Sequence, residues 1–321
     1  MNTTNKTDGP LPIIDLTLLG GTEQQREALA LSLAEACLHT GFFYIRDHGI
    51  PQALINQVFR ESQALFNLPE EQKQAIHKAN SRANRGYEPM KGQTLEPGTP
   101  PDLKEGFYIG EELDDADPRV QAGRFNQGAN QWPETLPSFR DTMTEYFNVM
   151  NSLGARIMEA LALSLNLKPG FFEEFCHQPL STLRLLHYPP QPANPAPGEK
   201  GCGAHTDFGG VTVLLLDDNP GLQVWDARSE RWIEANPIPG TFVVNLGDMI
   251  ARWTNDRYRS TLHRVVNSSG KERFSVPFFF SGNLDHTVTC LPTCLYEGEQ
   301  PHYPPTTVEA HLMEMYRRTY A

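Results

Sequence analysis

The chain has 321 residues, and its 39 acidic against 27 basic side chains give a formal net charge of −12. That balance disfavours nucleic acid and anionic membranes as partners, because neutralising phosphates needs clustered Lys and Arg. No apolar run approaches the roughly 18 residues of a membrane span, and the polar stretch 1–10 lacks a signal-peptide core. Five cysteines without a Cys-x-x-Cys pair argue against a disulfide framework or a Cys-rich zinc site. We therefore expect a cytoplasmic protein with reduced thiols that binds neither nucleic acid nor membrane.

Residues 1–180 are predicted to be largely helical, with a few strands. The β-branched runs 11–16 and 42–46 are typical of short strands. Thr22 and Gln25 have the spacing of a capping box, which begins a helix that we expect to end near His39. Further elements are expected in chain order: helices from Pro51 and from Pro69, a proline-rich loop at 88–102, and the longest helix at 138–166.

The period of the pattern changes after residue 180. Turn signals now separate short apolar runs, which lie at residues 183–188, 211–216, 222–225, 241–246, 261–266 and 274–280. Several short strands at such spacing are typical of an antiparallel sandwich or barrel. Length alone suggests about two domains, but we expect one catalytic domain, mainly β with flanking helices braced against a single β core. No obvious exposed apolar helix is left unassigned, so we expect a monomer.

The first chemical signal is His205-Thr206-Asp207. Residues i and i+2 of a strand point to the same face, so His205 and Asp207 could reach one metal ion while Thr206 points away. Two donors do not hold a divalent ion firmly, and His263, in another predicted strand, is the best candidate for a third. Two imidazoles and one carboxylate leave coordination positions open, as in non-haem Fe(II) enzymes that bind O₂ and a co-substrate. Taken alone, each histidine is better read as a surface or hydrogen-bonded side chain.

The second signal, Arg273-Phe274-Ser275, follows His263 by ten residues. Arg273 and Ser275 share a strand face, and a planar guanidinium beside a hydroxyl suits a carboxylate. We expect a hairpin that carries the metal ligand on one strand and this anion site on the next. The pattern fits a dicarboxylate with one end on iron and the other on Arg273; the alternative is a surface arginine paired with an acid.

Together, these motifs resemble the isopenicillin N synthase-like branch of the Fe(II)/2-oxoglutarate-dependent dioxygenases, and the likeness covers nearly the whole chain. The matching segments, in the family's order, are Leu11–Leu16, Gly41–Ile45, Asp47–Pro51, Phe66–Pro69, Arg85–Tyr87, Leu183–Pro190, His205–Asp207, Gly221–Val224, Asn245–Asp248, His263–Val265, Arg273–Ser275 and Tyr303–Pro305. One departure is Leu186-His187-Tyr188, where many relatives have Asn-Tyr-Tyr, which puts any contact of that Asn in doubt.

The resemblance implies a fold and a set of cofactors. The core would be a double-stranded β-helix, or jelly roll, over residues 181–285, between a helical part at 1–180 and a C-terminal segment and helix at 286–321. Fe(II) would be bound by three side chains, those of His205, Asp207 and His263. The co-substrate 2-oxoglutarate would be bound by Arg273 and Ser275, with Tyr188 as a helper hydroxyl. With O₂ as oxidant, a small organic substrate would be hydroxylated, desaturated or cyclised as succinate and CO₂ form.

Alternatives remain open at this point. In some relatives the Arg-x-Ser pair grips the substrate's own carboxylate and no 2-oxoglutarate is used; a non-catalytic ligand-binding protein is a remote alternative. The substrate cannot be deduced from the sequence, since fold does not set substrate. Candidate pocket residues in the front half are Arg85, Tyr87, Lys104 and Phe107, with exposed loop positions as the alternative. A second set either lines the cavity or, as we favour for most, packs the core: Phe208, Val211, Leu214, Trp225, Phe278 and Phe280.

Overall fold

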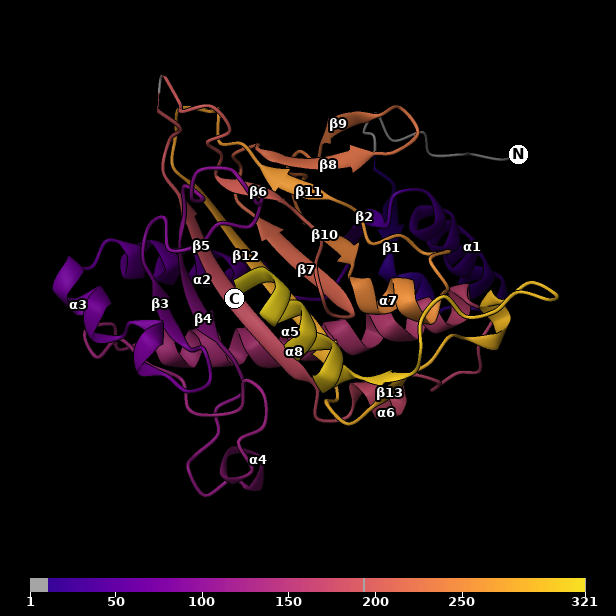
Figure 1. The fold of residues 1–321 in the computed structure, drawn as a ribbon. Coiled ribbons are helices and arrows are strands. Elements are labelled where there is room, and N and C mark those ends of the chain that lie inside the picture. The colour runs from indigo at the N-terminus through magenta and orange to yellow at the C-terminus, as the bar shows by residue number, and fades with distance from the viewer. Residues whose placement is uncertain (1–10, 193, 321) are drawn as a thin grey trace.

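Two β-sheets pack face to face, and helices cover the outer side of the larger one (Figure 1). The structure, a computed structural model, describes residues 11–192 and 194–320. The polar stretch 1–10, on which the signal-peptide expectation rests, lies outside the described residues. Within them, no helix is long and apolar enough to cross a membrane.

The larger sheet has eight strands, and strands from the front half of the chain form both of its edges. Its order is β1 (Ile13–Asp15), β2 (Phe42–Arg46), β10 (Thr241–Leu246), β7 (Val211–Leu216), β12 (Arg273–Gly282), β5 (Leu180–Tyr188), β4 (Glu105–Ile109) and β3 (Gly86–Glu88). The pairing is antiparallel throughout except between β1 and β2. The front half of the chain therefore extends the core sheet instead of standing apart from it.

The smaller sheet has four antiparallel strands, in the order β6 (Cys202–His205), β11 (His263–Val265), β8 (Leu222–Asp226) and β9 (Arg231–Glu234). A two-stranded sheet, β13 (Thr287–Val288) and β14 (Thr306–Thr307), follows near the C-terminus. The expected hairpin between His263 and Arg273 is wrong, because β11 pairs with β6 and β8 whereas β12 pairs with β5 and β7. The chain crosses from one sheet to the other after Val265, as in the jelly roll that the sequence predicts.

Eight α-helices lie within the described residues: α1 (Glu23–His39), α2 (Gln52–Phe66), α3 (Glu70–Ala75), α4 (Pro118–Gln121), α5 (Phe139–Ser164), α6 (Glu173–Cys176), α7 (Asp248–Trp253) and α8 (Val308–Tyr320). Short 3₁₀ turns are at Leu16–Gly20, Lys78–Asn80 and Pro292–Cys294. The capping box that begins α1 is confirmed, with Thr22 accepting from the Gln25 amide. The long α5 packs against α1, α2 and the sheet, as its apolar stripe predicts.

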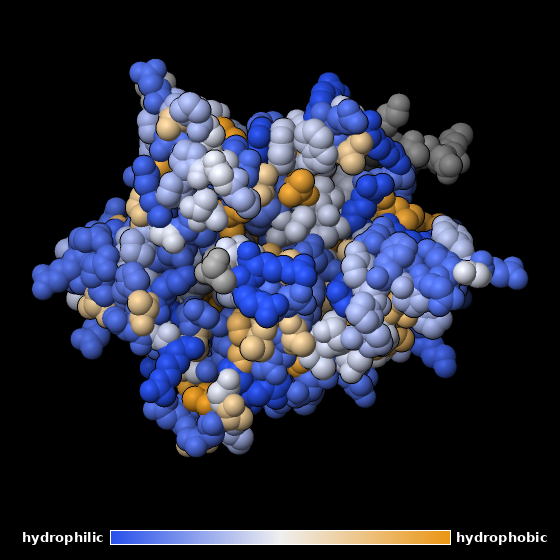
Figure 2. All heavy atoms as spheres, viewed as in Figure 1, coloured by the Kyte–Doolittle hydropathy of each residue, from blue (hydrophilic) through white to orange (hydrophobic). Residues whose placement is uncertain are grey.

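Side chains alternate between two cores along the strands of the larger sheet. On β10, Phe242 and Val244 face the helices while Val243 faces the smaller sheet. On β12, Phe278 and Phe280 face the helices, and both belong to the core, as expected, together with Val211. The odd-numbered residues of β12 and the even-numbered residues of β5 therefore line the space between the sheets. On the face shown in Figure 2 the surface is mostly hydrophilic, with apolar residues scattered over it.

Candidate metal centre and co-substrate site

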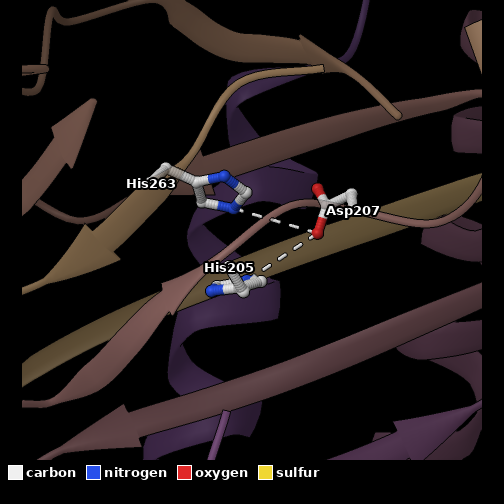
Figure 3. A group of neighbouring side chains, drawn as sticks. All are labelled: His205, Asp207 and His263. Carbon is white, nitrogen blue, oxygen red and sulfur yellow. Dashed lines mark ion pairs between the residues drawn. The ribbon is translucent and has the colours of Figure 1, made fainter. Parts of the chain in front are cut away.

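His205, Asp207 and His263 converge between the two sheets (Figure 3). One ligand atom from each lies within 4.8 Å of the others. The Nε2 atoms of His205 and His263 are each 3.8 Å from Oδ1 of Asp207. A divalent ion about 2 Å from each atom would fit between these donors. The three residues predicted to share one metal are thus brought together.

Strand pairing sets the two histidines side by side, because His263 is the direct Cα partner of His205 in the pairing of β11 with β6. Asp207 corrects the sequence interpretation: β6 ends at His205, so the carboxylate comes from the turn that follows and not from the strand. That turn packs closely on the start of α7. A Cβ at Gly247 would lie 2.2 Å from the Gly209 carbonyl oxygen, and the Asp248 amide donates to the Asp207 carbonyl at 2.8 Å. Close backbone packing therefore fixes the position of the turn that carries the Asp207 carboxylate.

Backbone carbonyls orient both imidazoles. Nδ1 of His205 lies 2.8 Å from the Gly203 carbonyl oxygen, and Nδ1 of His263 lies 3.1 Å from that of Thr261. With the proton on Nδ1, Nε2 keeps a lone pair for a metal, the usual arrangement of a ligating histidine. The sequence analysis did not identify these partners, because backbone acceptors leave no mark in residue type.

Two buried side chains hold the other oxygen of the carboxylate. Oδ2 of Asp207 accepts from Thr212 Oγ1 at 2.6 Å and from Asn245 Nδ2 at 2.7 Å, which leaves Oδ1 for a metal. Thr212 and Asn245 are direct partners across β7 and β10. The sequence analysis missed their role, although the signal was present: each is a polar residue inside an apolar strand, where it must find a hydrogen-bond partner.

The protonation states suit a metal. Burial and the neighbouring His205 lower the pKa of His263 to about 4, and burial likewise lowers the pKa of His205. Burial alone would raise the pKa of Asp207, but the two histidines and the hydrogen bonds from Asn245 and Thr212 outweigh it, so that pKa is lowered. The site therefore presents neutral imidazoles and an ionised carboxylate at neutral pH, the forms that bind a divalent ion.

Arg273, Ser275 and Tyr188 lie on the face of the larger sheet that lines the space between the sheets. Arg273 and Tyr188 are direct partners on β12 and β5, and the guanidinium lies 5.0 Å from the centre of the Tyr188 ring. Arg273 is 1% exposed, yet its Nε and Nη1 have no hydrogen-bond partner. Such buried donors are costly without an acceptor, and a ligand carboxylate would supply one. These residues thus fit the distal carboxylate of 2-oxoglutarate.

The departure at Leu186-His187 has a structural consequence. Leu186 lies on the inner face and supplies apolar contact where an asparagine would offer an amide. His187 points to the opposite side, where it stacks on Phe274 at 4.8 Å and its Nδ1 lies 2.7 Å from Oε1 of Glu105. Neither residue therefore provides a polar group to the co-substrate end.

An open pocket lies beside the metal centre, with about 580 Å³ of space that includes its solvent-filled mouth. It is bordered by the inner face of β5 and β12, by the turn after His205 and by α8. Phe208 lines it and also packs against the helix-side core, so it combines the two positions considered for its set. Thr206, expected to point away from the metal, also lines the pocket, and its hydroxyl donates to Asp248 at 3.3 Å.

The four candidate pocket residues of the front half are all buried and do not lie in exposed loops. Phe107 belongs to the helix-side core, and the Tyr87 hydroxyl donates to Glu105 on that side at 2.6 Å. Lys104 is hydrogen-bonded to Asp102 and reaches Sγ of Cys202 at 3.5 Å. Arg85 contacts the pocket wall, since its Nη2 donates to the carbonyl of Asn126, a lining residue, at 2.7 Å.

Comparison with known proteins matches both halves of the chain. The family model described as the non-haem dioxygenase in morphine synthesis N-terminal region matches residues 11–135, and that of the 2OG-Fe(II) oxygenase superfamily matches residues 179–282. The 2-oxoglutarate-Fe(II) type oxidoreductase hxnY of Emericella nidulans is 46% identical, over 96% of this chain and 90% of its own length. The 2-oxoglutarate-dependent dioxygenase citB of Monascus ruber is 39% identical, over 100% of this chain and 98% of its own length. The chain belongs to the 2OG-Fe(II) oxygenase superfamily.

Solved structures agree with this membership. The Neurospora crassa enzyme T7H in complex with alpha-KG, which is 2-oxoglutarate, superposes with a TM-score of 0.85 at 29% identity, covering 98% of each chain. The protein is thus an Fe(II)- and 2-oxoglutarate-dependent dioxygenase with O₂ as oxidant, and the jelly-roll core predicted from the sequence is confirmed.

Proposed function

We propose that His205, Asp207 and His263 hold the Fe(II), and that Arg273, Ser275 and Tyr188 hold the far carboxylate of 2-oxoglutarate. A small organic substrate occupies the pocket under α8 and is hydroxylated, desaturated or cyclised while succinate and CO₂ form. The observation that carries this proposal is the buried guanidinium of Arg273 with two unsatisfied donors, on the face of the larger sheet that lines the space between the sheets where the three ligand atoms converge. The comparisons support it, since related structures hold alpha-KG alone or with thymine.

Each residue has a physical task. When bound, the iron supplies the coupled activation of O₂ and decarboxylation of 2-oxoglutarate that drives substrate oxidation. Thr212 and Asn245 keep Asp207 in a single orientation, and the carbonyls of Gly203 and Thr261 do the same for the histidines. Arg273 supplies a local positive charge, which an acidic chain needs in order to bind a dianion.

Tyr188 acts as a neutral donor. Burial raises the pKa of its phenol, and its hydroxyl is hydrogen-bonded with Ser275. The proton therefore stays on the oxygen at neutral pH, and the phenol can donate to a carboxylate without adding a second negative charge. No proton transfer to or from Tyr188 is required in this role.

An anaerobic titration of the purified protein with Fe(II) and then 2-oxoglutarate tests the assignment. We expect a charge-transfer band in the visible range on addition of 2-oxoglutarate, and succinate once O₂ is admitted. Absence of both would leave the oxidase that uses no 2-oxoglutarate as the better explanation. A substrate library read out as succinate above the uncoupled background would then identify compounds that occupy the pocket.

Three further expectations stay predictions from the sequence. We propose that residues 1–321 act as one catalytic domain with the three parts given above, because front-half strands complete the core sheet. We also propose that the protein works as a monomer in the cytoplasm. Size-exclusion chromatography with light scattering tests the monomeric state, and cell fractionation tests the cytoplasmic location.

A further inference from the structure

The pocket beside the metal centre combines one fixed cation with several aromatic rings. Arg184 lines it from β5, and its guanidinium lies 4.5 Å from the centre of the Tyr108 ring and 4.7 Å from that of Phe279. Two rings thus hold the guanidinium at the pocket wall. Because the side chain is already ordered, binding a ligand costs less conformational entropy. Among the described residues of this pocket, Arg184 is the one with a permanent positive charge.

Aromatic rings form the remaining apolar wall. Tyr316 of α8 stands edge-on to Phe125 at 5.0 Å and to Phe208 at 6.0 Å, measured between ring centres. Phe279, on the sheet side, completes a space walled by rings. Such walls favour a flat, unsaturated ligand over a saturated one of similar volume, because ring pairs gain energy beyond the area that they bury.

A second, outer pocket shares Arg184 and Tyr316 with the inner one. His205 and Asp207 line only the inner pocket, whereas Lys78 and Glu88 line only the outer one, where they form an ion pair at 2.6 Å. With imidazoles counted as neutral, the charged side chains among the described residues that line the two pockets, the metal centre apart, sum to one positive charge. The charge balance favours an anion on the side of the outer pocket, despite the −12 of the whole chain.

We infer that the substrate is a small aromatic carboxylic acid, with its carboxylate on Arg184 and its ring between Phe279 and the rings of Phe208 and Tyr316. In this orientation the acid group faces the outer pocket and the far edge of the ring faces the metal ligands. Arg184 is then a specificity-determining residue, separate from the arginine that serves 2-oxoglutarate. This inference rests on the proposed function, since it concerns what the same metal centre oxidises.

Binding of simple probes tests the inference without turnover. The full chain, loaded anaerobically with Fe(II) and saturating 2-oxoglutarate, is titrated with benzoate, benzamide, cyclohexanecarboxylate and uracil. Calorimetry and the change in the visible charge-transfer band report binding. Benzoate should bind at least about tenfold more tightly than benzamide, which lacks the charge, and than cyclohexanecarboxylate, which lacks the flat ring. Tighter binding of uracil than of benzoate would overturn the inference that the substrate is an acid and would indicate a neutral ring compound instead.

Variants locate the interaction. Arg184→Gln should weaken benzoate binding by about tenfold or more and leave 2-oxoglutarate affinity within about twofold. Arg140→Gln is the matched control, because Arg140 also stacks on a ring, that of Trp132 at 5.7 Å, but lies exposed on α5. Unchanged benzoate binding in Arg184→Gln would overturn the inference. If the unaltered protein shows a normal 2-oxoglutarate band but does not bind benzoate, the inference is also overturned and the proposed function stands. If the 2-oxoglutarate band is absent, the result counts against the proposed function.

Discussion

The inner face of the larger sheet carries an arginine near an aromatic ring at two places, and the two surroundings differ. At the co-substrate end, Arg273 is fully buried beside Tyr188, and both come from core strands paired with each other. At the substrate end, Arg184 is half-buried between two pockets, and its surroundings include residues of α8. If these assignments are right, core strands enclose the co-substrate end, whereas the substrate end combines core strands with segments outside the core.

A row of paired residues across the sheet joins the metal centre to the substrate end. Asn245 of β10 faces Thr212 of β7, Thr212 faces Phe279 of β12, and Phe279 faces Thr182 of β5. The first two hold Asp207, and the last two line the pocket. Arg273, the proposed co-substrate arginine, lies six residues before Phe279 on β12. Changes in this row should therefore affect iron and substrate while sparing the anion site at Arg273.

Loss of a metal ligand should have the largest effect. In Asp207→Ala the site loses its only carboxylate, so we expect iron binding to fail and succinate formation to fall at least about a thousandfold. Iron content of the purified protein and succinate by mass spectrometry measure this. Asp226→Ala, at the end of β8, is the control and should retain both. Normal iron content in Asp207→Ala would refute its assignment as a ligand.

Removing the co-substrate arginine should have the next largest effect. Arg273→Ala should weaken 2-oxoglutarate binding by about a hundredfold, because a charged, buried hydrogen-bonding partner is lost, while iron affinity stays within about twofold. Arg273→Lys should recover part of the affinity, since it keeps the charge without the planar fork. Calorimetry on the iron-loaded protein gives both constants. If 2-oxoglutarate binding were unchanged, the anion site at this end of the sheet would be wrongly assigned.

The partners of Asp207 should matter less than the ligand itself. Asn245→Ala should weaken iron binding by about 10- to 100-fold, and Thr212→Val by a similar or smaller factor, because the carboxylate loses one of the hydrogen bonds that orient it. Competition with a chelator measures iron affinity. The 2-oxoglutarate affinity of the iron-saturated variants should stay near that of the unaltered protein. An equal loss at both sites would show that the two ends of the sheet are coupled.

The sequence was sufficient for most core strands and for the group of three candidate metal ligands, because both leave marks in residue type and spacing. The runs 211–216 and 241–246 coincide with β7 and β10 as observed. It could not predict that Asp207 leaves the strand, since that depends on the close packing of Gly209 against Gly247, residues distant in sequence. The expected hairpin failed for a similar reason: the turn after Val265 can join two sheets as readily as two neighbouring strands.

Substrate-side residues were the least predictable. Arg184 falls inside an apolar run that reads as an ordinary core strand, and nothing in its spacing indicates the pocket. Lys104 was a pocket candidate, but together with Asp102 it holds the strand that carries His205. Asp102 accepts from the Gly203 amide at 2.9 Å, and the Gly203 carbonyl in turn contacts His205. Such roles depend on which loop covers which strand edge, and one sequence does not reveal that.

The smallest effect on binding is expected on the helix-facing side of the larger sheet, at Glu105 of β4. This buried carboxylate accepts from Lys73 at 3.0 Å and from Tyr87 at 2.6 Å, and it contacts His187. Burial alone would raise its pKa, but the hydrogen bonds from these three groups outweigh it, so the pKa is lowered from the ordinary 4.5. A lowered pKa means that the stabilisation is present above pH 4.5 and is lost as the pH falls through the lower, folded value.

Glu105→Gln should therefore reduce the free energy of unfolding by roughly 1–3 kcal/mol at pH 7, and by progressively less as the pH drops below about 4. Denaturant unfolding at several pH values measures this. Glu70→Gln removes an exposed partner of the same lysine, 3.4 Å away, and should change stability by less than about 1 kcal/mol. Because Glu105 faces the helices, its variant should bind 2-oxoglutarate normally at pH 7. A large loss of that affinity would mean that the helix side of the sheet also shapes the co-substrate end.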